Sequence, residues 1–140
     1  MPKMIFVNLP VTDLAKSRKF YEAIGATNNP HFTDDSAAAM VISDTIYVMI
    51  MTHERWKTFT AREIPDAHKT AQVLLALTEE SRADVDARVK AASDLGTPDP
   101  NPVQEHGFMY GRSFADPDGH IWEVSWMDPA VAAGEAPAQA

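Results

Sequence analysis

The stretch from Ser113 to Trp126, SFADPDGHIWEVSW, reads as a strand, a tight turn and a second strand, and the second strand carries one acidic side chain, Glu123, in an otherwise apolar run. The segment Asp116-Pro117-Asp118-Gly119 predicts a tight turn, because proline presets φ, aspartate bonds nearby backbone and glycine accepts the left-handed conformation. Side chains alternate across the strand that follows, so Glu123 and Ser125 share one face and Trp122 lies on the other. A carboxylate placed there either meets solvent or points into a cavity, where it could anchor a ligand or act as a general base.

The strand before this turn offers two further polar side chains. Tyr110 and Arg112 alternate along it and therefore share a face. On the concave side of a sheet they could bind an anionic group, whereas on the convex side Arg112 would be a rim residue with its stem against apolar surface. The sequence leaves the two alternatives open.

All histidines fall in predicted turns or connecting segments: His31, His53, His68, His106 and His120. Two of them, His53 and His106, flank strands near the predicted cavity rim. They could approach Glu123 and complete an unusual site, or they could simply lie on the surface.

Size and charge limit the classes of function. The 140 residues fit one domain, no apolar run approaches the roughly 20 residues of a membrane span, and cysteine is absent. The opening segment MPKMIFVNL lacks the features of a secretory signal, so a cytoplasmic protein is expected. A formal net charge of -8 without a basic cluster argues against nucleic acid and anionic membranes as partners.

The order of predicted elements repeats once along the chain. Residues 4–52 read as a strand, a helix that begins after Asp13 and ends at Gly25, and strands over 37–43 and 45–52. Residues 53–71 read as a linker with a short helix over 54–61. Residues 72–128 then give a strand over 72–78, a helix from Ser81 to Gly96, a strand over 108–114 and the hairpin's last strand.

This repeat predicts an α+β fold. Two βαβββ repeats, 4–52 and 72–128, would each form a curved mixed sheet beside a cavity within a single domain over residues 1–128. Matching Ile46–Met51 to Ile121–Trp126 aligns the last strands of the two halves. Residues 129–140 are expected to form a mobile tail.

Two motifs carry a family resemblance. FVNLPVTDLAKSRKFYEAIGA and FADPDGHIWEV, in this order and separated by a second βαβ start, resemble the vicinal oxygen chelate superfamily, which includes glyoxalase I, bleomycin resistance proteins and extradiol dioxygenases. The resemblance covers residues 4 to 128 and is strongest to uncharacterised glyoxalase-like proteins. Fold alone does not fix function.

The resemblance also implies where a metal would be held, with one ligand from the first strand and one from the last strand of each half. Those positions fall here on Phe6, Val48, Leu74 and Glu123. An alignment shifted by one residue would put Met49 or Tyr47 in place of Val48, or Ile5 and Val7 in place of Phe6, and none of these is a usual ligand for such metals. Only Glu123 is a suitable ligand for a hard or borderline metal. The superfamily's metal site is therefore expected to be missing, and no cofactor is predicted.

These expectations favour a protein that binds a small molecule. The predicted wall carries Phe6, Asn8, Val48, Leu74 and Ser125 around Glu123, with Tyr110 and Arg112 as further candidate ligand contacts. Sequestration of a hydrophobic or cationic ligand is the first hypothesis. The alternatives are a lyase or isomerase with Glu123 as general base, and a metal-dependent lactoylglutathione lyase-like or dioxygenase enzyme with substitute histidine ligands. The resemblance further implies a homodimer.

Overall fold

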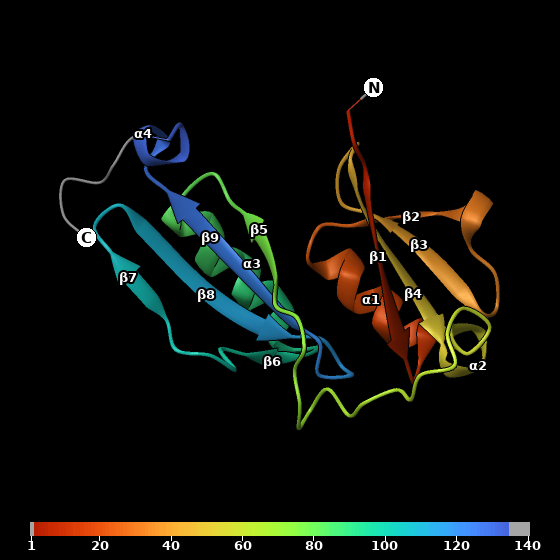
Figure 1. The fold of residues 1–140 in the computed structure, drawn as a ribbon. Coiled ribbons are helices and arrows are strands. Elements are labelled where there is room, and N and C mark those ends of the chain that lie inside the picture. Colours follow the sequence, from red (N-terminus) through yellow and green to blue (C-terminus); the bar gives the residue numbers. More distant parts are fainter. Residues whose placement is uncertain (1, 135–140) are drawn as a thin grey trace.

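The computed structural model describes residues 2–134, which form two modules of the same plan (Figure 1). The N-terminal module is a sheet of four strands in the order β1-β4-β3-β2, with β1 parallel to β4. Its elements in chain order are β1 (Ile5–Val11), α1 (Leu14–Ala23), β2 (Thr27–Asn29), the 3-10 turn η1 (Pro30–Phe32), β3 (Ala37–Val41) and β4 (Ile46–Thr52).

The C-terminal module repeats this arrangement in the order β5-β9-β8-β6, with β7 also paired to β8 and with β5 parallel to β9. Its elements are β5 (Leu75–Thr78), α3 (Arg82–Ser93), β6 (Thr97–Pro98), β7 (Gln104–His106), β8 (Met109–Ala115) and β9 (Ile121–Met127). The predicted α+β fold of two βαβββ units is therefore confirmed.

Side-chain caps start both long helices where the sequence predicts. The Asp13 carboxylate accepts a hydrogen bond from the backbone N–H of Lys16 at 3.0 Å, and the Ser81 hydroxyl accepts one from Asp84 at 3.1 Å. Each cap satisfies a donor that the first helical turn leaves free. Gly25, with φ at 105°, then turns the chain away from α1.

Three connections differ from the expectation. The linker helix α2 spans only His53–Trp56, because the Thr58 hydroxyl donates to the carbonyl of Arg55 and competes with further helical turns. The short strands β2 and β7 were not predicted, since they contain mostly polar residues. The expected tail begins with a short helix, α4 (Pro129–Ala132), capped by Asp128. Residues 135–140 lie outside the described residues.

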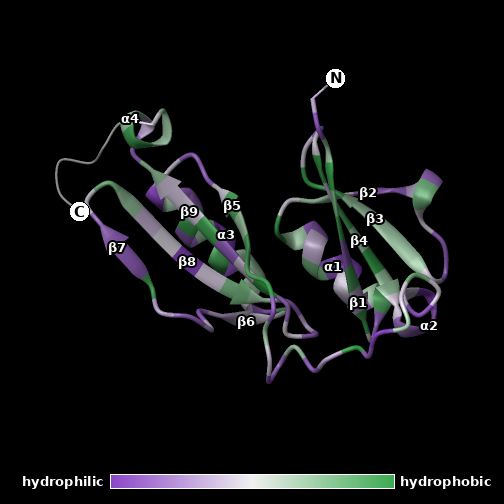
Figure 2. Cartoon of the chain, in the orientation of Figure 1, coloured by the Kyte–Doolittle hydropathy of each residue, from purple (hydrophilic) through white to green (hydrophobic). Residues whose placement is uncertain are grey.

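One apolar core joins the two modules. Each helix covers one face of its sheet, and both helices lie behind the sheets in Figure 1. Figure 2 shows β4 as hydrophobic over most of its length and β7 as hydrophilic. The fully buried large side chains come from both modules and include Phe20, Tyr21, Met40, Ile50, Phe114 and Trp122. Within residues 2–134, no helix is long and apolar enough to cross a membrane.

A buried polar network crosses the boundary between the modules. The Tyr21 hydroxyl of α1 donates to the Asp116 carboxylate at 2.7 Å, and the Trp122 indole N–H donates to the Tyr21 oxygen at 3.1 Å. Burial, and then the neighbouring Asp116 charge, raise the pKa of Tyr21 well above its usual value. Burial also raises the pKa of Asp116.

The raised pKa of Tyr21 predicts a difference in alkaline stability between the protein and Tyr21→Phe. Above about pH 10 the unfolded chain releases the Tyr21 proton while the folded chain keeps it, so the tyrosine contribution to stability is lost as pH rises. We expect the free energy of unfolding of the protein, minus that of the variant, to fall by about 1.4 kcal/mol per pH unit there. Urea unfolding of both proteins between about pH 8 and pH 11 measures it, and a constant difference would contradict the prediction.

Candidate functional site

The two sheets have a second face that the long helices α1 and α3 do not cover, and we call this the helix-free face. On β1 and β4 it carries Phe6, Asn8, Tyr47 and Met49, which stand opposite one another in the parallel register. The rings of Phe6 and Tyr47 stack with centroids 4.7 Å apart, and Phe6 is 53% exposed. An aromatic and largely apolar surface is thus open to solvent in the single chain.

Glu123 lies on the helix-free face of the C-terminal module. Its strand neighbours Trp122 and Val124 are buried against the core, so alternation turns Glu123 the other way. Ala76 of β5 and Ser113 of β8 stand directly opposite it. These positions agree with the predicted facing of Glu123 and Ser125.

A pocket of about 100 Å³ surrounds Glu123. The carboxylate is half-buried, and within residues 2–134 no side chain or backbone N–H hydrogen-bonds to it or pairs with its charge. The rest of the pocket is lined by Ala76, Pro102, Gln104, Met109, Gly111, Arg112, Ser113, Val124 and Ser125. The Arg112 guanidinium pairs with Asp86 and Asp99 rather than with Glu123. The Glu123 carboxylate therefore has neither a hydrogen-bond donor nor a cationic partner within residues 2–134.

Tyr110 and Arg112 lie on the opposite face, toward α3. The Tyr110 hydroxyl donates to Asp86 at 2.6 Å, and the Arg112 guanidinium donates to Asp86 at 3.0 Å and to Asp99. The hydrogen bonds from Tyr110 and then Arg112 hold the pKa of Asp86 below its usual value. The convex alternative thus holds, and these two side chains do not share a wall with Glu123.

The expectation that Val48 lines the cavity with Phe6 is wrong. Val48 is 0% exposed and belongs to the core, because Phe6 pairs with Tyr47 in the β1–β4 register. Matching β4 to β9 one residue out of phase turned every side chain of β4 to the wrong face. Tyr47 and Met49 occupy the helix-free positions instead.

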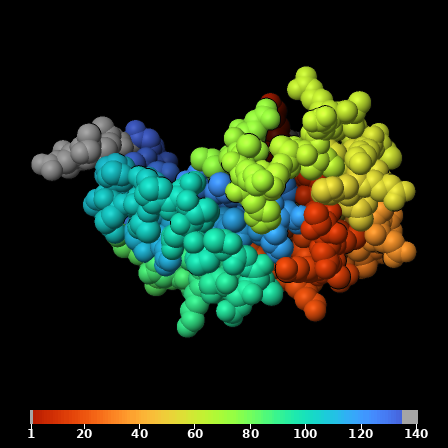
Figure 3. Space-filling view, turned by 90° about the horizontal axis from the view of Figure 1, so that it is seen from below, coloured from red at the N-terminus to blue at the C-terminus, as the bar shows by residue number. Residues whose placement is uncertain are grey.

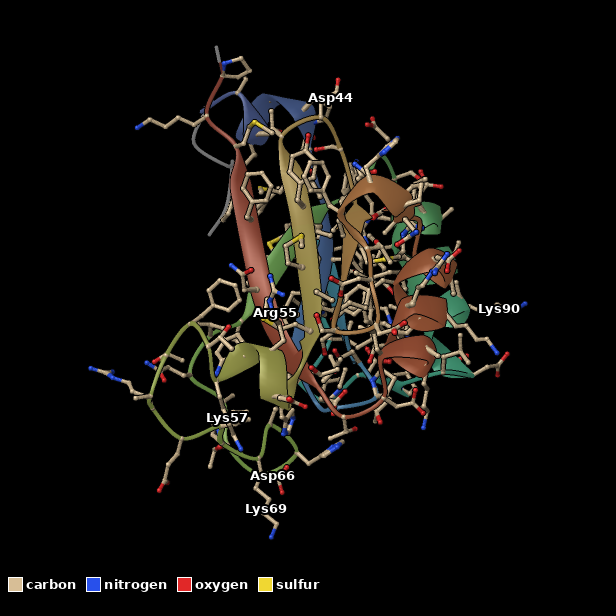
Figure 4. All side chains as sticks on the ribbon, turned by 90° about the vertical axis from the view of Figure 1, so that its right-hand side faces the viewer. Asp44, Arg55, Lys57, Asp66, Lys69 and Lys90 are labelled. Atoms are coloured by element: carbon tan, nitrogen blue, oxygen red, sulfur yellow. The ribbon has the colours of Figure 1, made fainter. Side chains whose placement is uncertain are left out.

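The linker forms a second pocket beside the helix-free face, which we call the linker pocket. It has a volume of about 350 Å³ and lies between the linker, the second half of β1 and the start of β5. Trp56, Arg62 and Glu63 line it from the linker, and Asn8 and Ile121 line it from the sheets. Figure 4 shows the linker residues Lys57, Asp66 and Lys69 at one end of the N-terminal module, away from the helix side marked by Lys90.

Sequence patterns missed most residues of these pockets. Gln104, Arg62 and Glu63 lie in segments without periodicity, where no rule assigns a direction to a side chain. Ser113 could have been found, because a hairpin closed at Asp116–Gly119 places it opposite Glu123. Leu74 lies just before β5 and is 51% exposed.

The linker is packed tightly against the hairpin turn. Figure 3 shows the turn, in blue, between the two modules with the yellow-green linker beside it. Gly119 has φ of +93°, and a Cβ atom there would lie 2.7 Å from the backbone carbonyl carbon of Ala67 and the backbone nitrogen of His68. The turn therefore needs glycine both for its conformation and for the passage of the linker.

Gly119→Ala should loosen the linker. We expect a loss of about 1–3 kcal/mol in the free energy of unfolding, from the left-handed backbone and the displaced linker, together with faster proteolysis within residues 57–71. Limited proteolysis and urea unfolding measure the two effects. Gly107→Ala is the matched control, because nothing lies within 4 Å of its Cβ position and its φ is not positive. Equal proteolysis of the two variants would contradict the prediction.

The donors present do not fit the superfamily's metal site. Phe6 and Leu74 are apolar, and the β4 position holds Tyr47 or Val48, which leaves Glu123 as the one carboxylate. Across residues 2–134, no three His, Cys, Asp or Glu side chains converge in a way that could hold a metal ion. His106 stacks on Phe108, and His53 lies near the linker, so neither completes a ligand set around Glu123.

Comparisons with known proteins agree with this geometry. The sequence profile of the Glyoxalase/Bleomycin resistance protein/Dioxygenase superfamily matches residues 3–124. This chain belongs to that superfamily. No curated protein matches the chain.

Several solved structures share the fold at low identity. A hypothetical protein from S. aureus is 22% identical with a TM-score of 0.74, over 90% of this chain and 95% of that one. A family enzyme from Burkholderia phytofirmans PsJN is 15% identical with a TM-score of 0.75, over 90% and 99%. A fosfomycin resistance protein from Mesorhizobium loti is 16% identical with a TM-score of 0.68, over 96% and 99%. At these identities the likeness extends to the fold alone.

Proposed function

We propose that this superfamily member binds a small organic molecule with a cationic group on its helix-free face, with Glu123 as the anionic anchor. The observation that carries the proposal is the half-buried carboxylate of Glu123, which finds no partner within residues 2–134. Partial burial of a charge costs free energy unless the charge is paired with an opposite charge or accepts hydrogen bonds. A ligand ammonium would supply both.

The linker pocket is suited to the rest of such a ligand. Ile121, which lines it, is two residues from Glu123 on the same face of β9, about 7 Å along the strand. A molecule of moderate length could therefore place an apolar or aromatic part near Trp56 and a cationic group at Glu123. Ser125 and Asn8 would then orient its polar atoms.

We propose further that a second copy of the chain closes the site. The pocket at Glu123, of about 100 Å³, is well below the roughly 300–1,000 Å³ of most ligand sites. Ile5 and Phe6 on the edge strand β1, and Leu74 just before the edge strand β5, are each more than half exposed, a combination typical of surfaces that pair. Light scattering on the full chain should give the mass of a homodimer, and Phe6→Lys should reduce it to that of one chain.

Sequestration of a hydrophobic or cationic compound is the activity that these features favour. The superfamily's description includes bleomycin resistance protein. In this chain the apolar helix-free surface of β1 and β4 and the lone carboxylate of Glu123 are features of a binding site rather than of a metal-dependent reaction centre.

A matched set of compounds tests the proposal. The set presents the same aromatic skeleton as an amine, an alcohol and a carboxylate, and thermal unfolding is followed for each. We expect the amine to raise the melting temperature most and the carboxylate least, because a ligand that binds the folded chain stabilises it by mass action. Equal effects of amine and carboxylate would contradict a role for the Glu123 charge.

A further inference from the structure

A separate cleft of about 540 Å³ lies between the two modules, at the end of the molecule opposite the linker. Ser43 lines this cleft, and its neighbour Asp44 marks that end in Figure 4, whereas Asp66 and Lys69 lie at the other. Both modules contribute walls: Ile24, Ile42 and Ile46 from one, and Leu77, Phe114 and Val124 from the other.

The walls of this cleft are continuous with the core. Phe114 and Val124 are buried in it, and Ile42 and Leu77 pack against it while remaining partly exposed to the cleft. Water in such a space contacts apolar side chains on both sides. An apolar molecule that replaced this water would be stabilised in proportion to the apolar surface it covers.

The rim of the cleft carries charge. Glu79 has a side chain only 12% exposed and pairs with Arg88 at 3.3 Å. Arg88 is held on its other side, because its guanidinium lies against Gly25 at the end of α1. Glu80 is exposed and forms no ion pair within residues 2–134, which leaves the rim with one net negative charge.

We infer that this inter-module cleft is a second binding site, which takes an apolar amine with its hydrocarbon part between the modules and its ammonium group at Glu80. The net negative rim favours a cation and repels an anion. The site is distinct from the one at Glu123, since Leu77, Phe114 and Val124 face the helices and Glu123 faces away from them. It does not depend on the function proposed for the helix-free face.

The probe is n-octylamine, with octanol and octanoate as matched compounds that lack the positive charge. Each is titrated into the isotope-labelled full chain below its aggregation concentration and followed by two-dimensional NMR. Octylamine should shift the signals of Ile42, Leu77 and Thr78, and should bind there at least about fivefold more tightly than octanoate. Octanoate binding as tightly as octylamine, or octylamine shifts that spare these residues, would overturn the inference.

Two variants test separately how the apolar walls and the charged rim of the cleft contribute to octylamine binding. Ile42→Trp fills the cleft from a half-exposed position just outside β3 and should abolish the octylamine shifts at Leu77 and Thr78. Glu80→Gln, an exposed change that leaves the fold in place, should weaken octylamine binding about three- to fivefold. Glu54→Gln, an exposed change on α2 outside both proposed sites, is the control and should leave binding at the cleft unchanged. If Glu80→Gln and Glu54→Gln bind octylamine equally, the assigned rim is wrong.

Discussion

Replacing Asp116 with alanine is expected to lower the free energy of unfolding by about 3 kcal/mol. Asp116 is 1% exposed, and its carboxylate accepts hydrogen bonds from the Tyr21 hydroxyl and from the backbone N–H groups of Asp118 and His120. Alanine would leave these donors without a partner. The Tyr21 hydroxyl is fully buried and cannot turn to water. The loss of its hydrogen bond to Asp116 is therefore expected to be the largest part of the destabilisation.

Urea unfolding at neutral pH measures this loss. Asp44→Ala is the matched control, because Asp44 is an exposed turn residue whose carboxylate accepts no hydrogen bond within residues 2–134, and it should change stability by less than about 0.5 kcal/mol. In a Tyr21→Phe background the cost of Asp116→Ala should shrink, since one unsatisfied donor is then absent. A loss of equal size in both backgrounds would contradict the hydrogen-bond network as the cause.

Local signals carried most of the fold prediction. The caps Asp13 and Ser81, the glycine after α1 and the turn at Asp116–Gly119 each act through neighbouring backbone groups, so a sequence pattern contains their full cause. The repeat predicted a mixed sheet in each module, and the structure shows that its parallel pairs are β1 with β4 and β5 with β9. The polar strands β2 and β7 have no such local signal, because pairing with β3 and β8 holds them in place.

The predicted face of a strand residue was correct where buried neighbours on the same strand determined it. It was wrong where it depended on aligning the two repeats. Glu123 stands between Trp122 and Val124, two apolar side chains that are expected to be buried. Alternation along the strand therefore predicts that Glu123 points to the opposite face. β4 is apolar on both faces, and nothing in its composition separates Val48 from Tyr47. Register with β1 decides between them, and register is a long-range property.

The polar residues on β8 illustrate a second limit. Tyr110 and Arg112 could have served either face, and their direction is set by Asp86 on α3 and Asp99 beside β6. These partners lie 13 to 26 residues away in sequence. The linker pocket has the same character, since its walls come from three segments that no periodicity connects.

Loss of the Glu123 charge should have the largest effect on ligand binding. In Glu123→Gln the side chain keeps its size and its position opposite Ser113 and Ala76, but it no longer carries a negative charge that pairs with a ligand cation. A hydrogen bond to a charged group contributes about 1.5–3 kcal/mol, which corresponds to a roughly 10- to 100-fold loss of affinity for an amine ligand. The corresponding alcohol should bind both proteins about equally.

The general-base alternative makes a different prediction for the same variant. If Glu123 acts on a substrate proton instead of holding a cation, Glu123→Gln should abolish turnover and spare affinity. Affinity measured on one variant therefore separates the two roles.

Calorimetric titration of Glu123→Gln with the tightest amine of the matched set tests the central claim most directly. Glu54→Gln, an exposed glutamate of α2 without an ion pair in the described part of the chain, is the matched control. The account predicts that the amine binds Glu54→Gln with the affinity of the unaltered protein and binds Glu123→Gln at least about tenfold more weakly. Equal affinity for all three proteins would contradict it.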